Sequence, residues 1–539
     1  MTLDAVQGVV DAAFRHLRSR CEVDGKLDSE LLDAHQLASY ELAFCAAELG
    51  AARAAVRHAA AVAGDSLVAA LARLYCAEAI QGTRARLEAR AEDYGLARAQ
   101  IGAAFDADAV QAQRREALAA DSIARIGQEL VARGALPAGH LDEDKEIIRR
   151  TFARFAAENV APLAQEIHRR DLDIPDAILK PAAELGLFGV SIPQRYGGLQ
   201  PDDHDDVLSM IVATEELSHA SLGAAGSLVT RPEIVARALL AGGTEEQRAY
   251  WLPRLAAGET LCAVSITEPD YGSDVASMKL RASRVPGGWQ LDGAKTWCTF
   301  GGRAELVLVL ARTNPEPALG HRGLSLFLVE KPAFSGHAFE HVQPQGGRLV
   351  GKAIATIGYR GMHSYDLFFE RLFVPDTALV GGAQGEGRGF YFTMSGFSGG
   401  RIQTAARAVG VMQAAYEAGV RYASGRKVFG AAVADYQLSQ VKIARMAAWL
   451  QAARQFTYAV ARLMEQGKGQ MEASLVKLFA CRAAEWLSRE SMQLHGGMGY
   501  AEESDVSRLF VDARVLSIFE GAEETLALKV IARDLIARA

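Results

Sequence analysis

The residue best suited to acid–base chemistry lies close to the C-terminal end of the sequence. Glu520 stands in LSIFEGAEETL, between an apolar run and a glycine. Partial removal from water makes a carboxylate a stronger base, so a glutamate beside Ile518 and Phe519 could take a proton from a weakly acidic carbon. A glutamate at the exposed start of a surface helix would show the same pattern. The rest of the sequence has to distinguish a catalytic base from such a surface residue.

Two segments in the middle of the chain could hold a flat ring and its phosphates. ITEPDYGSD, residues 266–274, places hydroxyl groups and backbone amides in a glycine-containing turn, which can bind phosphate. DGAKTWCTF follows on a predicted strand, where Trp297 and Thr299 would point to the same side. An aromatic face beside a hydroxyl suits a flat heteroaromatic cofactor. Ordinary turn residues and a core tryptophan remain the alternatives for each segment alone.

A third segment, QLHGGMGY, interrupts a helical pattern with three glycines. Glycine lets the backbone approach a ligand closely, because it has no side chain in the way. A plain turn between two helices would also use glycine. Residues 493–500 are therefore a candidate ligand-binding turn only in combination with the other segments.

Four regions must position these segments. Residues 1–138 are rich in Ala, Leu and Arg at three- and four-residue spacing, which predicts a helical extension that ends in the linker RGALPAGHLDEDK. Helical patterns continue over 139–260. Short β-rich runs separated by turns such as PGG and DG predict a β domain over 261–376, and long helical patterns return over 377–539. The predicted fold class is mainly α with a central β domain.

The extension resembles the last helical region. HQLASYELAFCAAELGAAR, from His35, aligns without gaps with YQLSQVKIARMAAWLQAAR, from Tyr436, and a weaker match pairs LARLYCAEA with LVKLFACRA. Alanine-rich helices can also match through composition alone. Our hypothesis is that the extension is a degenerate copy of the C-terminal bundle that has a structural role and binds no cofactor.

Composition narrows the class of protein. The 539 residues carry a formal net charge of -7 and are 50% hydrophobic. Acids and bases are interspersed without a dense basic block, which argues against nucleic acid as a partner. No uncharged run approaches the ~18–20 residues of a membrane span, and the N-terminal segment lacks the pattern of a signal peptide. The six scattered cysteines show no metal-ligand spacing, so we expect free thiols, no metal and a cytoplasmic location.

Five motifs in this order resemble the acyl-CoA dehydrogenase family: ITEPDYGSD, KTWCT, RKVFG, HGGMGY and FEG. The resemblance covers residues 142–539. It implies a helical domain, a β-barrel-like domain and a C-terminal helical bundle, here preceded by the extension. It also implies an enzyme that uses FAD to dehydrogenate an acyl-CoA substrate and passes electrons to electron transfer flavoprotein. The family fold implies a homodimer or homotetramer.

The resemblance assigns roles to individual residues. Glu520 matches the position of the family's usual catalytic base, and the alternative base position of some relatives holds Gly400, just before Arg401. The residues expected to bind FAD are Ile266, Thr267, Gly272, Ser273, Trp297, Thr299, Arg426, Phe429, Gln493, Gly496 and Gly497, the last five reaching the FAD of a neighbouring subunit. The residues expected to bind substrate are Ser273, Arg401, Phe519, Gly521 and Arg231.

The extension, with TEPDYGSD and FSGGRIQTAARAVG, is similar to a branch of the family that converts (2S)-methylsuccinyl-CoA to mesaconyl-CoA in the ethylmalonyl-CoA pathway. A substrate that ends in a carboxylate needs a cation in its pocket, because an unpaired buried charge is costly. Arg231, in GSLVTRPEI, is the candidate. The alternatives are a short- or branched-chain monocarboxylic acyl-CoA dehydrogenase, an acyl-CoA oxidase and a non-catalytic DNA-binding relative.

Overall fold

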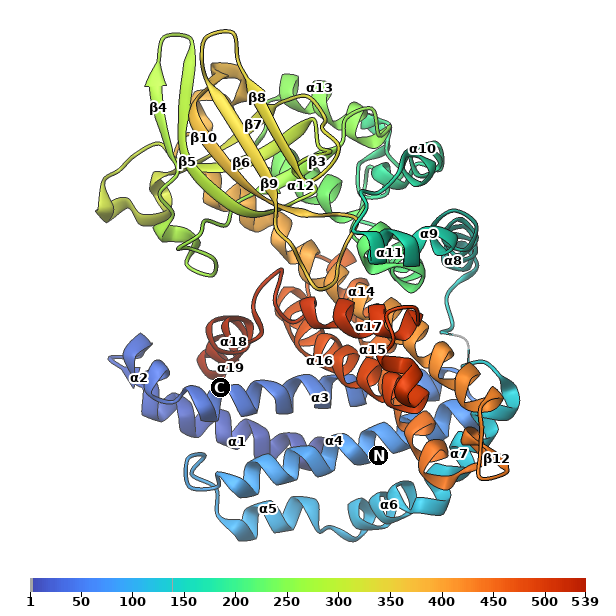
Figure 1. Ribbon diagram of the computed structural model, residues 1–539. Helices are drawn as coiled ribbons and strands as arrows, with labels where there is room; N and C mark the ends of the chain where they lie inside the picture. Colours follow the sequence, from blue (N-terminus) through green and yellow to red (C-terminus); the bar gives the residue numbers. More distant parts are fainter. Residues whose placement is uncertain (1–2, 138) are drawn as a thin grey trace. The chain divides into compact units, whose positions relative to one another are not determined.

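The computed structural model describes residues 3–137 and 139–539. Residues 1, 2 and 138, which belong to the predicted extension, lie outside this part. The chain forms two compact units (Figure 1). The first combines both ends of the sequence, Met1–Glu146 and Thr404–Ala539, and the second contains Ile147–Gln403. Helices predominate in both units, and the β-strands gather in the second, as the predicted fold class requires.

The first unit is built of helices joined by short connections, with two small hairpins. Its long helices bury alanine-rich faces, which let neighbouring backbones approach closely. The helices are α1 (Leu3–Cys21), α2 (Ser29–Ala34), α3 (Gln36–Ala61), α4 (Ser66–Ala89), α5 (Arg98–Phe105), α6 (Asp108–Leu118), α7 (Ala120–Arg133), α14 (Gly389–Gly425, which begins in the second unit), α15 (Gln437–Glu465), α16 (Gln470–His495), α17 (Asp505–Val515), α18 (Glu523–Thr525) and α19 (Arg533–Arg538), with the π-helix η11 (Leu526–Ala532) between the last two.

The extension and the C-terminal helices share one core. Helix α3 packs against α4, α15, α16 and η11, and α7 packs along α15. At Gly127 of α7 an added Cβ would lie 2.1 Å from the carbonyl oxygen of Gln440, so the two backbones meet directly. Glu78 of α4 accepts hydrogen bonds from Arg445 Nε at 2.5 Å and Trp449 Nε1 at 2.6 Å. In Figure 1 the blue helices α1 and α3 accordingly lie beside the red α18 and α19.

The two halves of the sequence repeat fall on corresponding helices. His35 directly precedes α3, and Tyr436 directly precedes α15. The weaker match falls inside α4 and α16, which follow α3 and α15 in the chain. The repeated segments thus agree in order and in where each first helix begins, which supports the hypothesis of a degenerate copy.

The second unit combines a helical part with a curled β-sheet. Its helices are α8 (Glu143–Phe155, which begins in the first unit), α9 (Ala161–Arg170), α10 (Asp176–Glu184), α11 (Val207–Ala220), α12 (Thr230–Gly242) and α13 (Glu245–Ala256), with the π-helices η1 (Ala156–Val160) and η4 (Leu222–Gly226). Its strands are β3 (Cys262–Ser265), β4 (Arg281–Val285), β5 (Gly288–Thr299), β6 (Leu306–Arg312), β7 (Leu324–Glu330), β8 (Ala338–Val342), β9 (Arg348–Ala353) and β10 (Ser364–Pro375).

The sheet has the order β3-β6-β4-β5-β10-β9-β8, with β7 paired to β6. Since β3 and β8 stand at the two ends of this order, the curled sheet is a half-barrel, which agrees with the predicted barrel-like domain. Leucines point to one face of strand β6 and smaller apolar residues to the other, and both faces are buried. Leu306, Leu308 and Leu310 pack in a core shared with α12 and α13, whereas Val307 and Val309 pack in the core on the opposite face.

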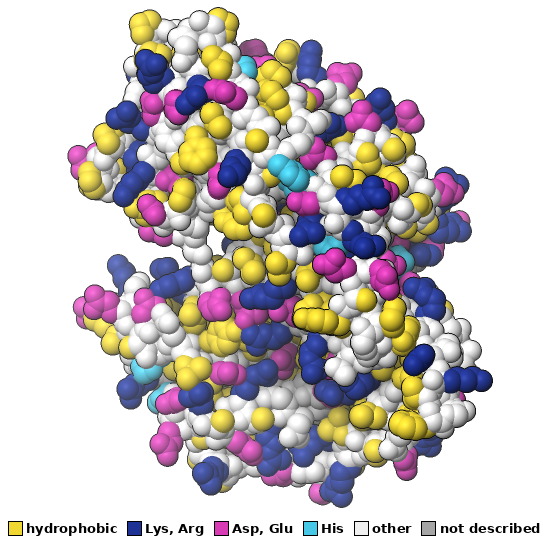
Figure 2. All heavy atoms as spheres, viewed as in Figure 1, with side chains coloured by type: hydrophobic (Ala, Val, Ile, Leu, Met, Phe, Trp, Pro, Cys, Tyr) yellow, Lys and Arg dark blue, Asp and Glu magenta, His cyan; other side chains and the backbone are white. Residues whose placement is uncertain are grey.

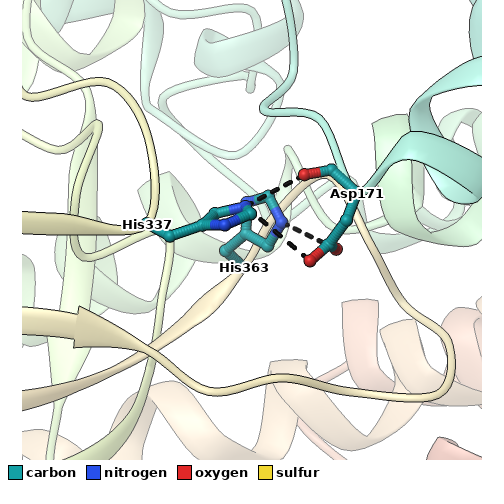
Figure 3. A group of neighbouring side chains, drawn as sticks. All are labelled: Asp171, His337 and His363. Atoms are coloured by element: carbon teal, nitrogen blue, oxygen red, sulfur yellow. Dashed lines mark hydrogen bonds and ion pairs between the residues drawn. The ribbon is translucent and has the colours of Figure 1, made fainter.

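A buried histidine ties the end of α9 to the start of β10 (Figure 3). His363 Nδ1 lies 3.1 Å from Asp173 Oδ1, and its Nε2 lies 3.1 Å from Asp171 Oδ1. His337 Nε2 contacts the backbone oxygen of Asp171 at 2.9 Å, and Arg360 Nε lies 3.5 Å from its carboxylate. Burial by itself would lower the pKa of His363, but hydrogen bonds with the two aspartates outweigh it and raise the pKa.

The raised pKa of His363 predicts a pH-dependent stability. A histidine whose pKa is raised by folding contributes fully below its unfolded value of ~6.5, and the contribution is lost as the pH rises through the folded value. The melting temperature should therefore fall more between pH 6 and pH 8.5 in the wild-type protein than in His363→Asn. His321→Asn, outside this cluster, should follow the wild type. Equal pH dependence in all three proteins would contradict the assignment.

Other general features of the described part can be stated briefly. Each of the six cysteines is a buried free thiol. None of the described helices combines the length and apolar character needed to cross a membrane. Figure 2 shows acidic and basic side chains interspersed over the visible face.

Candidate active site

A buried ion pair fixes the turn that follows β3. Lys295 of β5 points inward and donates hydrogen bonds to the carbonyl oxygen of Ile266 at 2.7 Å and to Glu268 Oε1 at 3.0 Å. The backbone amides of Lys279 and Leu280 also donate to the Glu268 carboxylate, at 2.6 and 2.8 Å. Burial lowers the pKa of Lys295 to about 8 despite the opposing charge of Glu268. The buried side chain of Lys295 thus attaches the TEPDYGSD turn to β5.

The surface of this turn leaves room for a ligand. The backbone amide of Thr296 donates to the carbonyl oxygen of Thr267 at 2.9 Å, which places the turn along β5. Gly272 and Ser273 are exposed, and Ile266 is buried below them. A Cβ added at Gly272 would meet only Thr267 Cγ2, at 4.0 Å. An open backbone beside threonine and serine hydroxyls fits phosphate or the polar edge of a ring.

The strand carrying Trp297 does not alternate regularly. Lys295 pairs with Leu367 and Cys298 with Tyr365, so Thr296 and Trp297 together stand opposite a single residue, Asp366. This β-bulge accompanies the positive φ of Trp297, 56°. The indole is 54% exposed, whereas Thr299 is buried. From the period-two alternation of a regular strand, the sequence predicted that Trp297 and Thr299 face one shared surface. The bulge interrupts this alternation, and the two side chains differ in exposure. An exposed indole on a rigid strand fits a flat aromatic ligand.

Thr299 has a partner that the sequence did not single out. Its Oγ1 lies 3.0 Å from Ser364 Oγ, and both residues are buried. Ser364 begins β10 and pairs with Thr299 across the sheet. The neighbouring His363 carbonyl oxygen accepts from the Phe300 amide at 2.8 Å. Only strand pairing brings Ser364 to this position, because 65 residues separate the two hydroxyls in sequence.

Glu520 lies in a closed loop of the first unit, between α17 and α18. The backbone amide of Glu523 donates to the carbonyl oxygen of Ser517 at 3.0 Å and closes the loop. Glu520 has a left-handed conformation with φ 53°, and Gly521 follows with φ 103°. A non-glycine residue rarely adopts positive φ unless its surroundings hold it there, and such residues concentrate at functional sites. The FEG motif is therefore a strained turn that presents one carboxylate.

Two buried cations lie behind this loop. Lys477 Nζ, on α16, donates to the Gly521 carbonyl oxygen at 2.5 Å. Burial lowers the pKa of Lys477, although Cys481 and Glu520 oppose the shift. The guanidinium of Arg407 lies 4.7 Å from the ring centre of Phe519. Both cations are almost fully buried, so they hold the residues on either side of Glu520 from the interior.

The RKVFG and HGGMGY motifs lie on other edges of the first unit. Phe429 and Gly430 form the tip of a hairpin between β11 (Lys427–Val428) and β12 (Ala431–Ala432), both with positive φ, and Phe429 is fully exposed. Gly496 and Gly497 directly follow α16, and an added Cβ at either would meet nothing within 4 Å. Arg426 and Gln493 are exposed.

A cavity of about 290 Å³ lies at the end of α16. It is lined by Ala418, Arg421, Tyr422, His495, Met498, Glu503, Ser504, Asp505 and Val506. The rings of Tyr422 and His495 stack at 4.3 Å. The volume is close to the lower end of the ~300–1,000 Å³ typical of small-molecule sites. The HGGMGY turn therefore borders a hollow that could hold part of a ligand.

The two arginines expected to contact substrate belong to different helices. Arg231, on α12, is buried in the second unit. Burial raises the pKa of the Cys298 thiol to about 11, and the charge of Arg231 opposes the shift, so the guanidinium acts within the interior of this unit. Arg401 is partly buried on α14. The structure thus places Arg231, Arg401 and the TEPDYGSD and KTWCT segments in one unit, and Glu520, Phe519, Gly521 and the RKVFG and HGGMGY motifs in the other.

Comparison with known proteins finds relatives of this chain. The chain is 38% identical to (2S)-methylsuccinyl-CoA dehydrogenase of Cereibacter sphaeroides, over 99% of this chain and 97% of that protein. Butyryl-CoA dehydrogenase from Megasphaera elsdenii is 29% identical, with a TM-score of 0.66 over 73% of this chain and 98% of that one. A glutaryl-CoA dehydrogenase from Mycobacterium smegmatis in complex with FADH2 is 26% identical, with a TM-score of 0.63 over 73% and 95%.

The family match covers most of the chain after the extension. Residues 142–259 match the N-terminal domain of acyl-CoA dehydrogenases, residues 263–372 the middle domain and residues 387–536 the C-terminal domain. The fold and the family predicted from the five motifs are therefore confirmed. With its curled sheet between helical regions and its relatives at this level of identity, the chain belongs to the acyl-CoA dehydrogenase family.

Proposed function

We propose that this protein oxidises (2S)-methylsuccinyl-CoA to mesaconyl-CoA in the ethylmalonyl-CoA pathway and passes the electrons to electron transfer flavoprotein. The observation that carries the proposal is the 38% identity to the Cereibacter sphaeroides enzyme over 99% of this chain, which includes the extension. The butyryl-CoA dehydrogenase structure, in contrast, covers 73% of the chain. Similarity through the extension therefore supports this substrate over those of shorter relatives.

The residues present fit FAD, the cofactor of this family. The open turn at Gly272 and Ser273 and the exposed indole of Trp297 suit its phosphates and its ring. We assign Ile266, Thr267 and Thr299 to the same half of the cofactor. Bound FAD supplies the hydride acceptor for the β-carbon.

The second set of cofactor contacts would come from a neighbouring subunit. The fully exposed Phe429 at the tip of its hairpin, together with exposed Arg426, is suited to reach a partner. We assign Gln493, Gly496 and Gly497 to the adenosine half, because this turn borders the cavity at the end of α16. These assignments require a homodimer or a homotetramer.

Glu520 is the proposed base that takes the α-proton of the thioester. A carboxylate is too weak to do this alone, so the charge that develops on the thioester oxygen must be stabilised, and the loss of one such donor typically costs ~3 kcal/mol. The backbone N–H of Glu520 is one proposed donor. The left-handed turn at Glu520 and Gly521, held from the interior by Lys477, fixes the orientation of both groups. Phe519 and Gly521 would border the substrate.

Anaerobic mixing of the FAD-loaded protein with (2S)-methylsuccinyl-CoA tests the proposal, because reduction bleaches the flavin absorbance. Butyryl-CoA and isobutyryl-CoA serve as comparison substrates. Rapid bleaching by methylsuccinyl-CoA alone is the expected result. Bleaching only by the monocarboxylic thioesters would overturn the substrate, and peroxide formation in air without an added acceptor would indicate an oxidase. Transfer of the electrons to purified electron transfer flavoprotein tests the proposed acceptor.

Replacing Arg231 should affect the dicarboxylic substrate selectively. Arg231 is the proposed partner of the terminal carboxylate, and truncating one member of a buried charge pair costs roughly 3–5 kcal/mol. Arg231→Met is therefore expected to raise KM for methylsuccinyl-CoA by at least about 100-fold and to leave KM for butyryl-CoA within about threefold. Arg231→Lys, which keeps the charge without the planar fork, should fall between. Equal effects on the two thioesters would remove the assignment.

A further inference from the structure

The N-terminal extension contributes side chains to the loop that carries Glu520. Helix α3 belongs to the extension, and its Tyr40 hydroxyl donates a hydrogen bond of 2.5 Å to Glu523 Oε1. Glu523 is the first residue of α18, three positions after Glu520, and its backbone amide closes the loop onto Ser517. Tyr40 of the extension therefore contacts the side chain of Glu523, the residue that closes the loop containing Glu520.

A second partner makes this contact a network. Arg482 of α16 forms an ion pair with Glu523 and donates from Nη2 to the Tyr40 hydroxyl at 2.6 Å. Its guanidinium also lies 3.9 Å from the ring centre of Phe44, one turn further along α3. The ring centres of Tyr40 and Phe44 are 5.2 Å apart. Two aromatic residues of the extension thus fix Arg482, and Arg482 and Tyr40 together fix Glu523.

The Glu523 side chain is 14% exposed and that of Arg482 is 43% exposed, so water is largely excluded from the carboxylate and reaches the guanidinium. Hydrogen bonds to a charged group contribute more than neutral ones, typically ~1.5–3 kcal/mol. Burial and the hydrogen bond to Glu523 raise the pKa of Tyr40 to about 12, so the hydroxyl stays protonated and donates at neutral pH. Lys477 holds the Gly521 carbonyl oxygen on the other side. Glu520 directly precedes the short anchored segment from Gly521 to Glu523, inside the loop that the Glu523 amide closes onto Ser517.

We propose that Tyr40 is a positioning residue for Glu520, acting through Glu523, so that the extension takes part in catalysis by holding the base in place. The proposal rests on the assignment of Glu520 as the base. Tyr40 does not touch the substrate. Its loss should lower the rate of proton removal without weakening substrate binding.

The test compares FAD-loaded Tyr40→Phe with Tyr94→Phe, a change at a buried tyrosine of the extension whose hydroxyl contacts the Ala38 carbonyl oxygen at 3.5 Å. Tyr40→Phe should lower the rate of flavin reduction by saturating methylsuccinyl-CoA roughly tenfold, with unchanged substrate affinity and FAD content and only a small fall in melting temperature. Tyr94→Phe should reduce flavin at the wild-type rate. A wild-type rate in Tyr40→Phe, or a loss confined to melting temperature, would overturn the proposal.

A double-mutant cycle with Glu523→Ala separates positioning from a general structural effect. If Tyr40 acts through Glu523, Tyr40→Phe has no further effect once Glu523 is alanine. Losses that multiply would overturn the route through Glu523. Glu520→Gln in the same assay keeps the two proposals apart: full activity there would refute the base, whereas an inactive Glu520→Gln beside a fully active Tyr40→Phe would refute only this inference.

Discussion

Glu520→Gln should reduce flavin at least about 100-fold more slowly than the wild type, since a positioned general base contributes roughly 10²–10⁴-fold and no second base stands before Arg401, where the residue is Gly400. The amide keeps the size of the side chain and cannot accept a proton. Stopped-flow absorbance under anaerobic conditions measures the rate, and the flavin spectrum reports whether FAD is retained. We expect full FAD content, so that the loss reflects the missing carboxylate.

Glu524→Gln is the matched control for this prediction. Glu524 is four residues away and exposed, so the same change there should leave the rate within about twofold. Comparable losses in both variants would point to a disturbed loop. Near-normal reduction by Glu520→Gln would refute the assignment of the base and require a different one.

Glu268→Gln should destabilise the second unit by about 3–5 kcal/mol, because it leaves the buried ammonium of Lys295 without its counter-charge. The Lys295 side chain is fully buried, and Glu268 also holds the amides of Lys279 and Leu280. Thermal or urea unfolding of the protein measures the loss. We also expect a lower FAD content, since the same carboxylate fixes the turn with Thr267, Gly272 and Ser273.

Two further variants test this explanation. Lys295→Met combined with Glu268→Gln removes both charges, so it should recover part of the stability that Glu268→Gln alone loses. Asp376→Asn removes one partner of the exposed Arg284–Asp376 pair and should cost at most about 1 kcal/mol. Identical stability of Glu268→Gln and the wild type would show that the pair does not hold the turn.

The sequence predicted the family and the order of the regions because those features are local. Short apolar runs such as LVLVL on β6 indicate buried strands, and apolar residues at three- and four-residue spacing indicate helices. The motif around Glu520 was recognisable because a glycine follows a carboxylate there. Hence Glu520, Trp297 and Gly496 could all be named before the fold was known.

Other features depend on contacts between distant segments and left no local pattern. The bulge at Trp297 results from pairing with β10, and Ser364 reaches Thr299 through the same pairing. Tyr40 and Glu523 are 483 residues apart in sequence. A tyrosine on an alanine-rich helix gives no sign of its partner. The internal repeat was the one signal that linked the extension to the C-terminal helices, and it did not identify the residues that meet.

The composition of the first unit from both ends of the chain has a consequence for biosynthesis. The faces of α3 and α7 that pack on α15 stay without their partner until the ribosome has made residues 437–465. At about 5–20 residues per second, this interval is on the order of tens of seconds. The nascent N-terminal helices must therefore be kept from aggregating during translation, and we expect chaperone depletion to lower the yield of this protein more than that of relatives without the extension.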